Sequence, residues 1–161
     1  MSDIRGERRE AAPERAHEEL RALKAAGFNM LVDLTCVDYK AQGRSPRFDV
    51  IYRLLRLDPA TGLDEGRVEL HCAVGEEPAL RSAADLWPVA DWLERELWDM
   101  FGVRFADRPG IERLLLYESF VGHALRKDYP IARRQPLIGP QSGDLPDSPS
   151  FNVVRPKVSF E

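Results

Sequence analysis

Three stretches of this chain alternate apolar and polar residues with a period of two, and they restrict the fold more than any other feature. They cover residues 28–36, 48–54 and 68–74. Such a period is typical of β-strands with one covered face and one exposed face. The covered faces are expected to carry Phe28, Met30, Val32, Leu34 and Cys36, then Phe48, Val50, Tyr52 and Leu54, then Val68, Leu70, Cys72 and Val74.

The opposite faces of these strands are polar, with Asp33, Thr35, Asp49, Arg53, Arg67, Glu69 and His71. The connections, residues 42–46 and 58–62, are rich in Gly and Pro and too short for a crossover helix. The three strands therefore predict an antiparallel meander.

Residues 88–101 predict one short helix. Pro88 suits the first helical position, and Gly102 is the residue type that ends a helix in the left-handed conformation. Asp91, Arg95 and Asp99 are four residues apart, so the arginine can pair with either acid. An apolar stripe is formed by Val89, Leu93, Leu97 and Met100 or Phe101. We expect a charged ridge on an apolar base.

The remaining segments complete a prediction of fold class and domains. Residues 13–24 predict a second helix, and the charged residues 1–12 are expected to be frayed. Short extended pieces are expected at 103–105 and 113–117. The chain thus predicts one α+β domain over residues 1–131, with a mostly antiparallel sheet and helices covering one face.

The end of the chain has a different composition. Half of the twelve prolines fall in residues 130–161, which argues against helix or sheet there. The segment still carries apolar residues such as Leu137 and Phe151. We expect residues 132–161 to form an extended, proline-rich C-terminal arm that docks on a partner subunit.

Composition excludes several functional classes. The net charge of −4 provides no basic field for nucleic acid, and no apolar run reaches the roughly 20 residues of a membrane span. Cys36 and Cys72 are too few for a four-cysteine cluster, and both fall on apolar strand faces, where inert thiols are expected. A reducing compartment without a signal peptide fits this pattern.

No group of residues forms a convincing catalytic set. Glu94 and Glu96 would point roughly 200° apart on a helix, so they do not converge on a metal or a substrate. His123 lies near Asp128 but has no nucleophile beside it. The basic residues 126, 127, 133 and 134 lack a phosphate cradle and favour docking on an acidic protein surface. These features together favour an assembly component.

Residues 87–103 and 120–130 resemble the two signature motifs of the "30 kDa" subunit family of respiratory complex I, the NADH:quinone oxidoreductase. The first reads Trp-Pro-Val-Ala-Asp-Trp-Leu-Glu-Arg-Glu-Leu-Trp-Asp-Met-Phe-Gly-Val, and the second Phe-Val-Gly-His-Ala-Leu-Arg-Lys-Asp-Tyr-Pro. Arg108, Glu112 and Ala124 depart from the family pattern, which usually has histidine, a basic residue and proline there.

The resemblance implies a subunit that binds no cofactor and has no active site of its own. It would belong to the peripheral arm of a proton-pumping NADH:quinone oxidoreductase, on the cytoplasmic side of the bacterial cell membrane. Its neighbours would be the quinone-site and terminal Fe–S cluster subunits, and FMN, the clusters and quinone would lie in partner subunits. The alternatives are the same role in a hydrogenase-type or ferredoxin-dependent complex, or a free-standing adaptor.

Both motifs are expected to contact partners. The helix acids and Arg95 should form salt bridges within the chain or across the interface, and residues 122–129 should dock on the quinone-site subunit. The expected interface comprises Glu94, Arg95, Glu96, Asp99, Phe101, Gly122, His123, Leu125, Arg126, Lys127, Asp128 and Tyr129.

Overall fold

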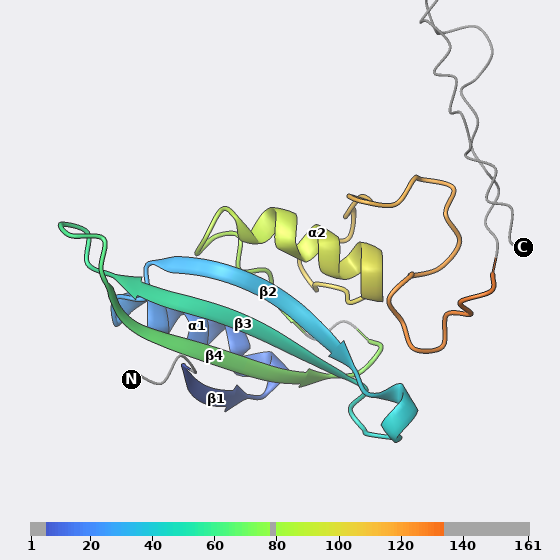
Figure 1. The fold of residues 1–161 in the computed structure, drawn as a ribbon, viewed down its shortest axis with the longest axis horizontal. Coiled ribbons are helices and arrows are strands. Elements are labelled where there is room, and N and C mark those ends of the chain that lie inside the picture. The colour runs from blue at the N-terminus through green and yellow to red at the C-terminus, as the bar shows by residue number, and fades with distance from the viewer. Residues whose placement is uncertain (1–5, 78–79, 134–161) are drawn as a thin grey trace, which may run out of the picture.

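The computed structural model describes residues 6–77 and 80–133. Its elements are β1 (Glu7–Ala11), η1 (Pro13–Arg15), α1 (Ala16–Ala25), β2 (Met30–Asp38), η2 (Lys40–Gln42), β3 (Phe48–Leu57), β4 (Asp64–Val74) and α2 (Ala90–Phe101). The fold is α+β, with a four-stranded mixed sheet in the order β1-β4-β3-β2 (Figure 1). The arm expected over residues 132–161 lies, from residue 134 onward, outside the described residues.

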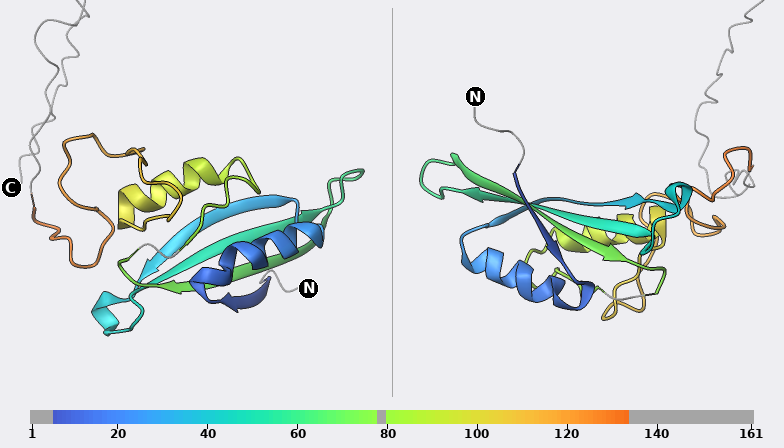
Figure 2. Two further views of the ribbon diagram at one scale, coloured as in Figure 1. Left: turned by 180° about the vertical axis from the view of Figure 1, so that it is seen from behind. Right: turned by 90° about the horizontal axis from the view of Figure 1, so that it is seen from below.

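The predicted meander is confirmed, because β3 pairs antiparallel with both β2 and β4. The inner face of the sheet carries the core in cross-strand rows. One row is Leu34, Tyr52 and Leu70, and the next is Cys36, Val50 and Cys72. All six side chains are buried, and α1 and α2 both cover this face (Figure 2).

The first half of β2 departs from the expected alternation. Met30 and Val32 are 45% and 51% exposed, whereas Leu31 is buried. The register of β2 against β3 shifts between Leu31 and Asp33. A β-bulge inserts one residue into a strand and reverses the phase of its faces, which explains why Met30 and Val32 do not share a face with Leu34.

The N-terminal segment contains a strand where we expected a frayed end. Residues 7–11 pair parallel with β4, which makes the sheet mixed. This strand has no apolar alternation, and main-chain hydrogen bonds to β4 hold it in the sheet. On its exposed side, Arg8 pairs with Glu10 at 2.9 Å. A Cβ at Gly6 would lie 2.8 Å from the backbone of Arg67, so β1 can approach β4 only because residue 6 is glycine.

The predicted helices are present with slightly later starts. α2 begins at Ala90 rather than at Pro88 and ends at Gly102, which has φ of +75° as expected for a helix-terminating glycine. Phe105 forms an isolated bridge with Leu80, whereas residues 113–117 contain bends and form no strand.

Candidate docking interface

Glu94 lies in the interior and holds the loop that precedes α2. It is 0% exposed. Its Oε1 accepts a hydrogen bond from the Ala83 N–H at 2.7 Å, and its Oε2 accepts from Ser82 Oγ at 2.8 Å and from Arg108 Nη1 at 2.9 Å. Burial raises the pKa of Glu94, and these three donors oppose that rise. Glu94 therefore forms the expected salt bridge within the chain and presents no surface to a partner.

Asp99 organises the loop that follows α2. It is 0% exposed, and its Oδ2 accepts from the N–H groups of Leu114, Leu115 and Leu116 at 3.1, 2.8 and 2.9 Å. Its Oδ1 accepts from Arg113 Nη1 at 2.6 Å. Burial alone would raise the pKa of Asp99, but these four donors outweigh burial and lower it. A fully paired carboxylate of this kind fixes a loop that has no regular hydrogen bonding of its own.

Arg95 does not make the predicted pair with Asp91 or Asp99. Asp91 pairs with Arg108, and Asp99 pairs with Arg113. Arg95 instead donates to two backbone carbonyl groups, Glu112 O at 3.4 Å and Arg113 O at 2.9 Å. The charged ridge is thus divided, because Glu94 and Asp99 are buried against arginines of the following loop whereas Glu96 is exposed.

Arg108, one of the departures from the family pattern, has a clear structural role. It donates to the carboxylates of both Asp91 and Glu94. Burying Glu94 without a cation would carry a large desolvation cost, and Arg108 supplies that cation. Of the other two departures, Glu112 contributes a carbonyl group to Arg95, and the structure gives no reason for Ala124.

The second motif caps the C-terminal end of α2. The last four carbonyl groups of a helix have no partner within the helix. Here Gly102 N donates to Trp98 O at 2.8 Å, and Leu125 N donates to Met100 O at 3.0 Å. The side chains of His123 and Arg126 donate to Asp99 O at 3.0 Å and Phe101 O at 2.6 Å. All four carbonyl groups are satisfied.

His123 acts as a hydrogen-bond donor to the end of the helix. A carbonyl oxygen can only accept, so Nδ1 carries the proton. Burial lowers the pKa of His123, which keeps the ring neutral at pH 7. The ring also contacts Trp98 edge to face at 5.9 Å, and Asp128 is engaged elsewhere.

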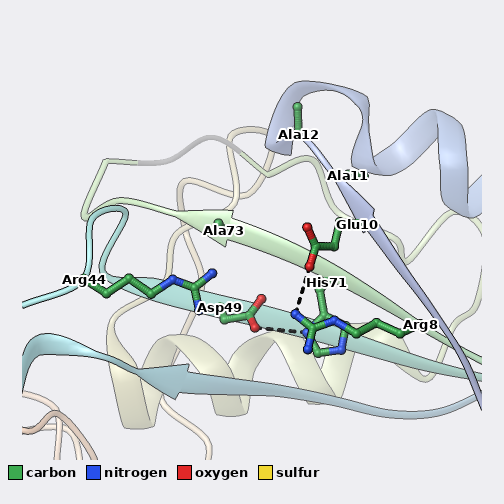
Figure 3. Close-up of a pocket in the computed structure, with 8 residues that line it drawn as sticks. All are labelled: Arg8, Glu10, Ala11, Ala12, Arg44, Asp49, His71 and Ala73. Carbon is green, nitrogen blue, oxygen red and sulfur yellow. Dashed lines mark hydrogen bonds and ion pairs between the residues drawn. The ribbon is translucent and has the colours of Figure 1, made fainter. Parts of the chain in front are cut away.

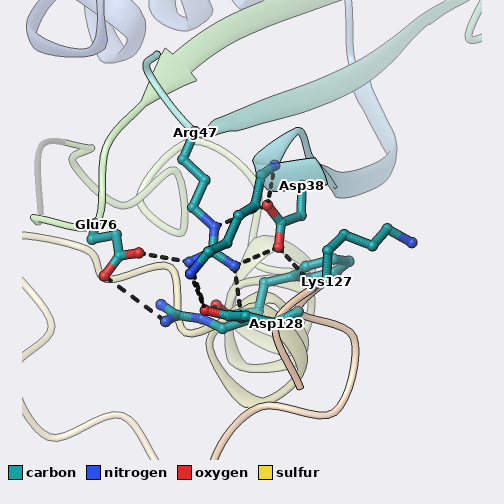
Figure 4. A network of polar contacts seen from close by, with 8 residues as sticks. Asp38, Arg47, Glu76, Lys127 and Asp128 are labelled. Carbon is teal, nitrogen blue, oxygen red and sulfur yellow. Dashed lines mark hydrogen bonds and ion pairs between the residues drawn. The ribbon is translucent and has the colours of Figure 1, made fainter. Parts of the chain in front are cut away.

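Figure 4 shows the network that fastens the second motif to the sheet. Arg47, immediately before β3, forms two hydrogen bonds to Asp38 at 2.6 and 2.9 Å and two to Asp128 at 2.8 and 3.2 Å. Glu76 accepts from Arg47 at 2.6 Å, and the Lys127 N–H donates to Asp38 at 2.8 Å. Hydrogen bonding to Arg47 lowers the pKa of Asp38 to about 2.

Sequence reasoning did not identify Asp38 and Arg47. Their opposite charges flank the turn between two predicted antiparallel strands, which brings them close together and was the available signal. The third member, Asp128, is 90 residues beyond Asp38, so only the tertiary structure shows that it completes the network.

The expected interface residues include two groups with different roles. One group serves the chain's own fold: Glu94, Arg95, Asp99, His123, Arg126 and Asp128. The other retains exposed surface, with Leu125 50% exposed and Glu96 and Lys127 also exposed. Phe101, Gly122 and Tyr129 are partly buried. Any docking surface here must be built mainly from the second group.

The face of the sheet opposite the helices contains a small polar pocket of about 280 Å³ (Figure 3). Asp49 and His71 lie at its floor, with Oδ2 and Nδ1 3.0 Å apart, and both are buried rather than exposed as the alternation predicted. Arg8, Glu10 and Arg44 lie around them, so the charges balance. The eight lining residues include no Ser, Thr, Cys or Lys, so this His–Asp pair has no nucleophile to activate.

Two further observations concern the described residues alone. Within residues 6–77 and 80–133, no three His, Cys, Asp or Glu side chains are placed to hold a metal ion. The helices of the same ranges are too short and too polar to cross a membrane.

Comparison with known proteins gives consistent matches. Residues 10–135 match the family model described as respiratory-chain NADH dehydrogenase, 30 kDa subunit. An NADH-quinone oxidoreductase subunit of Rhizobium etli is 36% identical over 83% of this chain and 70% of its own length. A second such protein, from Ruegeria sp., is 45% identical over 70% of this chain, which spans 53% of that relative's length.

A solved structure extends the likeness to three dimensions. It is that of the trypsin-resistant fragment 1–134 of Nqo5. It is 38% identical, covers 62% of this chain and 78% of its own, and superimposes with a TM-score of 0.55.

Proposed function

Since this chain belongs to the family of the 30 kDa subunit of respiratory-chain NADH dehydrogenase, we propose that it is a structural subunit of the peripheral arm of an NADH:quinone oxidoreductase. The match over residues 10–135 is the observation that carries this proposal, because it includes the whole described fold from the end of β1 onward. In this role the chain has no active site of its own.

The internal architecture of the chain suits a scaffold. Electron transfer and quinone reduction require fixed geometry, so a subunit that orients others must itself be rigid. Glu94 and Asp99 immobilise the loops on either side of α2, and the second motif caps the helix. Rigidity of this kind contributes to catalysis in neighbouring subunits without a catalytic residue here.

We place the docking surface on the exposed residues of the second motif. Leu125 supplies apolar area and Lys127 supplies positive charge, and Arg133, three residues beyond the motif, adds a second positive charge. An acidic surface with an apolar depression complements them, and we assign it to the quinone-site subunit. The terminal Fe–S cluster subunit would be the other neighbour, with FMN, the clusters and quinone all in partner subunits.

Some residues of the second motif make contacts within the chain, so substituting them does not test docking on a partner directly. Alanine at Arg126 or Asp128 would disturb this chain's own helix cap or network before it disturbed a partner. Lys127→Glu is the sharper probe, because the Lys127 side chain is exposed. Arg21→Glu, an equivalent reversal on the exposed side of α1, is the matched control.

The test is affinity purification of the tagged full chain from native membranes, with mass spectrometry of the proteins that accompany it. We expect quinone-site and cluster subunits, with their amount reduced at least tenfold by Lys127→Glu and unchanged by Arg21→Glu. NADH oxidation by the purified assembly separates this complex from hydrogenase-type or ferredoxin-dependent relatives. Recovery of the wild-type chain alone, as a well-behaved monomer, would refute the proposal.

A further inference from the structure

The outward side of α2 carries a second surface that the fold itself does not use. Val89 and Trp92 are 46% and 58% exposed, and Leu115, in the loop that Asp99 organises, is 63% exposed. Glu96 continues the same side of the helix at the next turn and is also exposed. An exposed tryptophan among other apolar side chains is typical of a binding surface.

Trp92 is held in a defined orientation. The guanidinium carbon of Arg95 lies 5.3 Å from the centre of the Trp92 ring, within the range of a cation–π contact. Arg95 is itself fixed by its hydrogen bonds to Glu112 O and Arg113 O. A side chain that is already ordered loses little conformational entropy on binding, so Trp92 is prepared to act as an anchor.

Arg95 also indicates the chemistry of what binds. Its Nε and Nη2 donate to the two carbonyl groups, while Nη1 has no acceptor in the described part of the chain. The nearby acids do not serve it, because Asp91 and Asp99 are paired with Arg108 and Arg113. A carboxylate supplied from outside would complete the set.

We propose that Trp92 and Arg95 form a second docking point, which takes a neighbouring protein subunit through an apolar pocket with a carboxylate at its rim. Trp92 would enter the pocket, and Arg95 Nη1 would donate to the carboxylate. This inference rests on the proposed function, since it requires that other subunits surround the chain. It differs from the Leu125 and Lys127 surface, which lies beyond the C-terminal end of α2.

The experiment compares Trp92→Ala, Trp92→Phe and Leu63→Ala in the tagged full chain, purified from membranes in competition with the untagged wild-type chain. Leu63 is 66% exposed near the β3–β4 turn and is the matched control. We expect Trp92→Ala to reduce incorporation into the complex about tenfold, Trp92→Phe to restore most of it, and Leu63→Ala to leave it unchanged. The thermal unfolding midpoint of each isolated variant should equal that of the wild type.

The possible results separate this inference from the proposed function. If Trp92→Ala assembles normally while Lys127→Glu does not, the second docking point is refuted and the structural role stands. If the wild-type chain brings down no other subunit, the proposed function fails. If Trp92→Ala instead abolishes self-association of the isolated chain, the surface binds a second copy and the stated occupant is wrong.

Discussion

Individual carboxylates decide how the loops of this protein are held, and Asp99 is the clearest case. A single buried side chain satisfies three consecutive backbone N–H groups and one guanidinium. Buried backbone donors without partners cost free energy comparable to lost hydrogen bonds, so the loop at 113–116 depends on this one residue.

Asp99→Asn is expected to lower the free energy of unfolding by about 3 kcal/mol. The amide keeps the shape of the carboxylate, but it removes the charge that pairs with Arg113 and turns an N–H₂ group toward other donors. Glu96→Gln makes the same chemical change at an exposed position of the same helix and should cost less than about 0.5 kcal/mol. Urea unfolding of both variants gives the comparison, and equal losses would show that Asp99 does not hold the loop.

The pKa of Asp38 predicts a specific dependence of stability on pH. It is about 2 in the folded chain against an ordinary value of 3.8, because of Arg47 and two backbone donors. The folded state therefore binds fewer protons, and the resulting stabilisation is complete above pH 4 and lost as the pH falls toward 2. The difference corresponds to about 2 kcal/mol.

Asp38→Asn should accordingly cost about 2 kcal/mol at pH 7, and the gap to the wild type should narrow between pH 4 and 2. Urea unfolding at several pH values measures both effects. A gap that stays constant over this range would show that the Asp38 charge is not what fastens the second motif.

Burial of the helix acids could not be predicted from the sequence, and the reason is specific. The helical period predicted Leu97 on the apolar stripe and Glu94 on the charged ridge, because a carboxylate is buried only when a partner is present. The partners, Arg108 and Arg113, come from a loop without periodicity. The local sequence pattern therefore predicted the helix, but it did not predict which of its side chains face the core.

At the level of elements, α2 and the second motif form one unit, joined where the helix ends. Gly102 allows the close approach, because a Cβ there would lie 2.7 Å from the His123 ring and 2.9 Å from Arg126 Nη2. The glycine is thus required twice, for its positive φ and for the space beside it.

Two glycine substitutions separate these requirements. Gly43 also has positive φ, +65°, but nothing lies within 4 Å of a Cβ there. Gly43→Ala should cost about 1 to 2 kcal/mol for the left-handed conformation alone. Gly102→Ala should cost a further 1 to 3 kcal/mol, since it also displaces the cap.

Equilibrium unfolding measures the free energy of unfolding that each glycine variant loses. The rate of trypsin cleavage after Arg126 measures whether the second motif is displaced from the end of α2. Equal costs for the two variants would mean that the motif does not pack on the helix end as described.

The elements themselves were predictable to the extent that their signals are local. β3 and β4 follow from strict alternation, and α2 from its spacing and its terminal glycine. The bulge in β2 and the parallel pairing of β1 were not predictable, because both depend on neighbouring strands rather than on the segment's own residues.

For the whole molecule, the described residues form one core with helices on one face only, and the second motif is attached at the edge where β2 ends. The two cysteines lie on different strands, so the reactivity of each thiol measures the opening of its own part of the structure. Both are buried, and burial raises the pKa of Cys36 and of Cys72 to about 12, so neither reacts until its surroundings open.

Cys36 lies on β2, two residues before Asp38, whereas Cys72 lies on β4 with β1 and β3 on either side. Regions of a protein can open separately, at free energies below that of global unfolding. If the Asp38 network holds the second motif over this end of β2, Asp38→Asn should speed maleimide labelling of Cys36 about tenfold more than that of Cys72. Gly62→Ala, which strains the β3–β4 connection through its positive φ of +70° and has nothing within 4 Å of the added Cβ, should change both rates by the same factor. Peptide mapping by mass spectrometry measures the labelling of each cysteine separately. Equal acceleration of both labelling rates in Asp38→Asn would show that the molecule opens as one unit. The Asp38 network would then not hold the second motif independently of the rest of the fold.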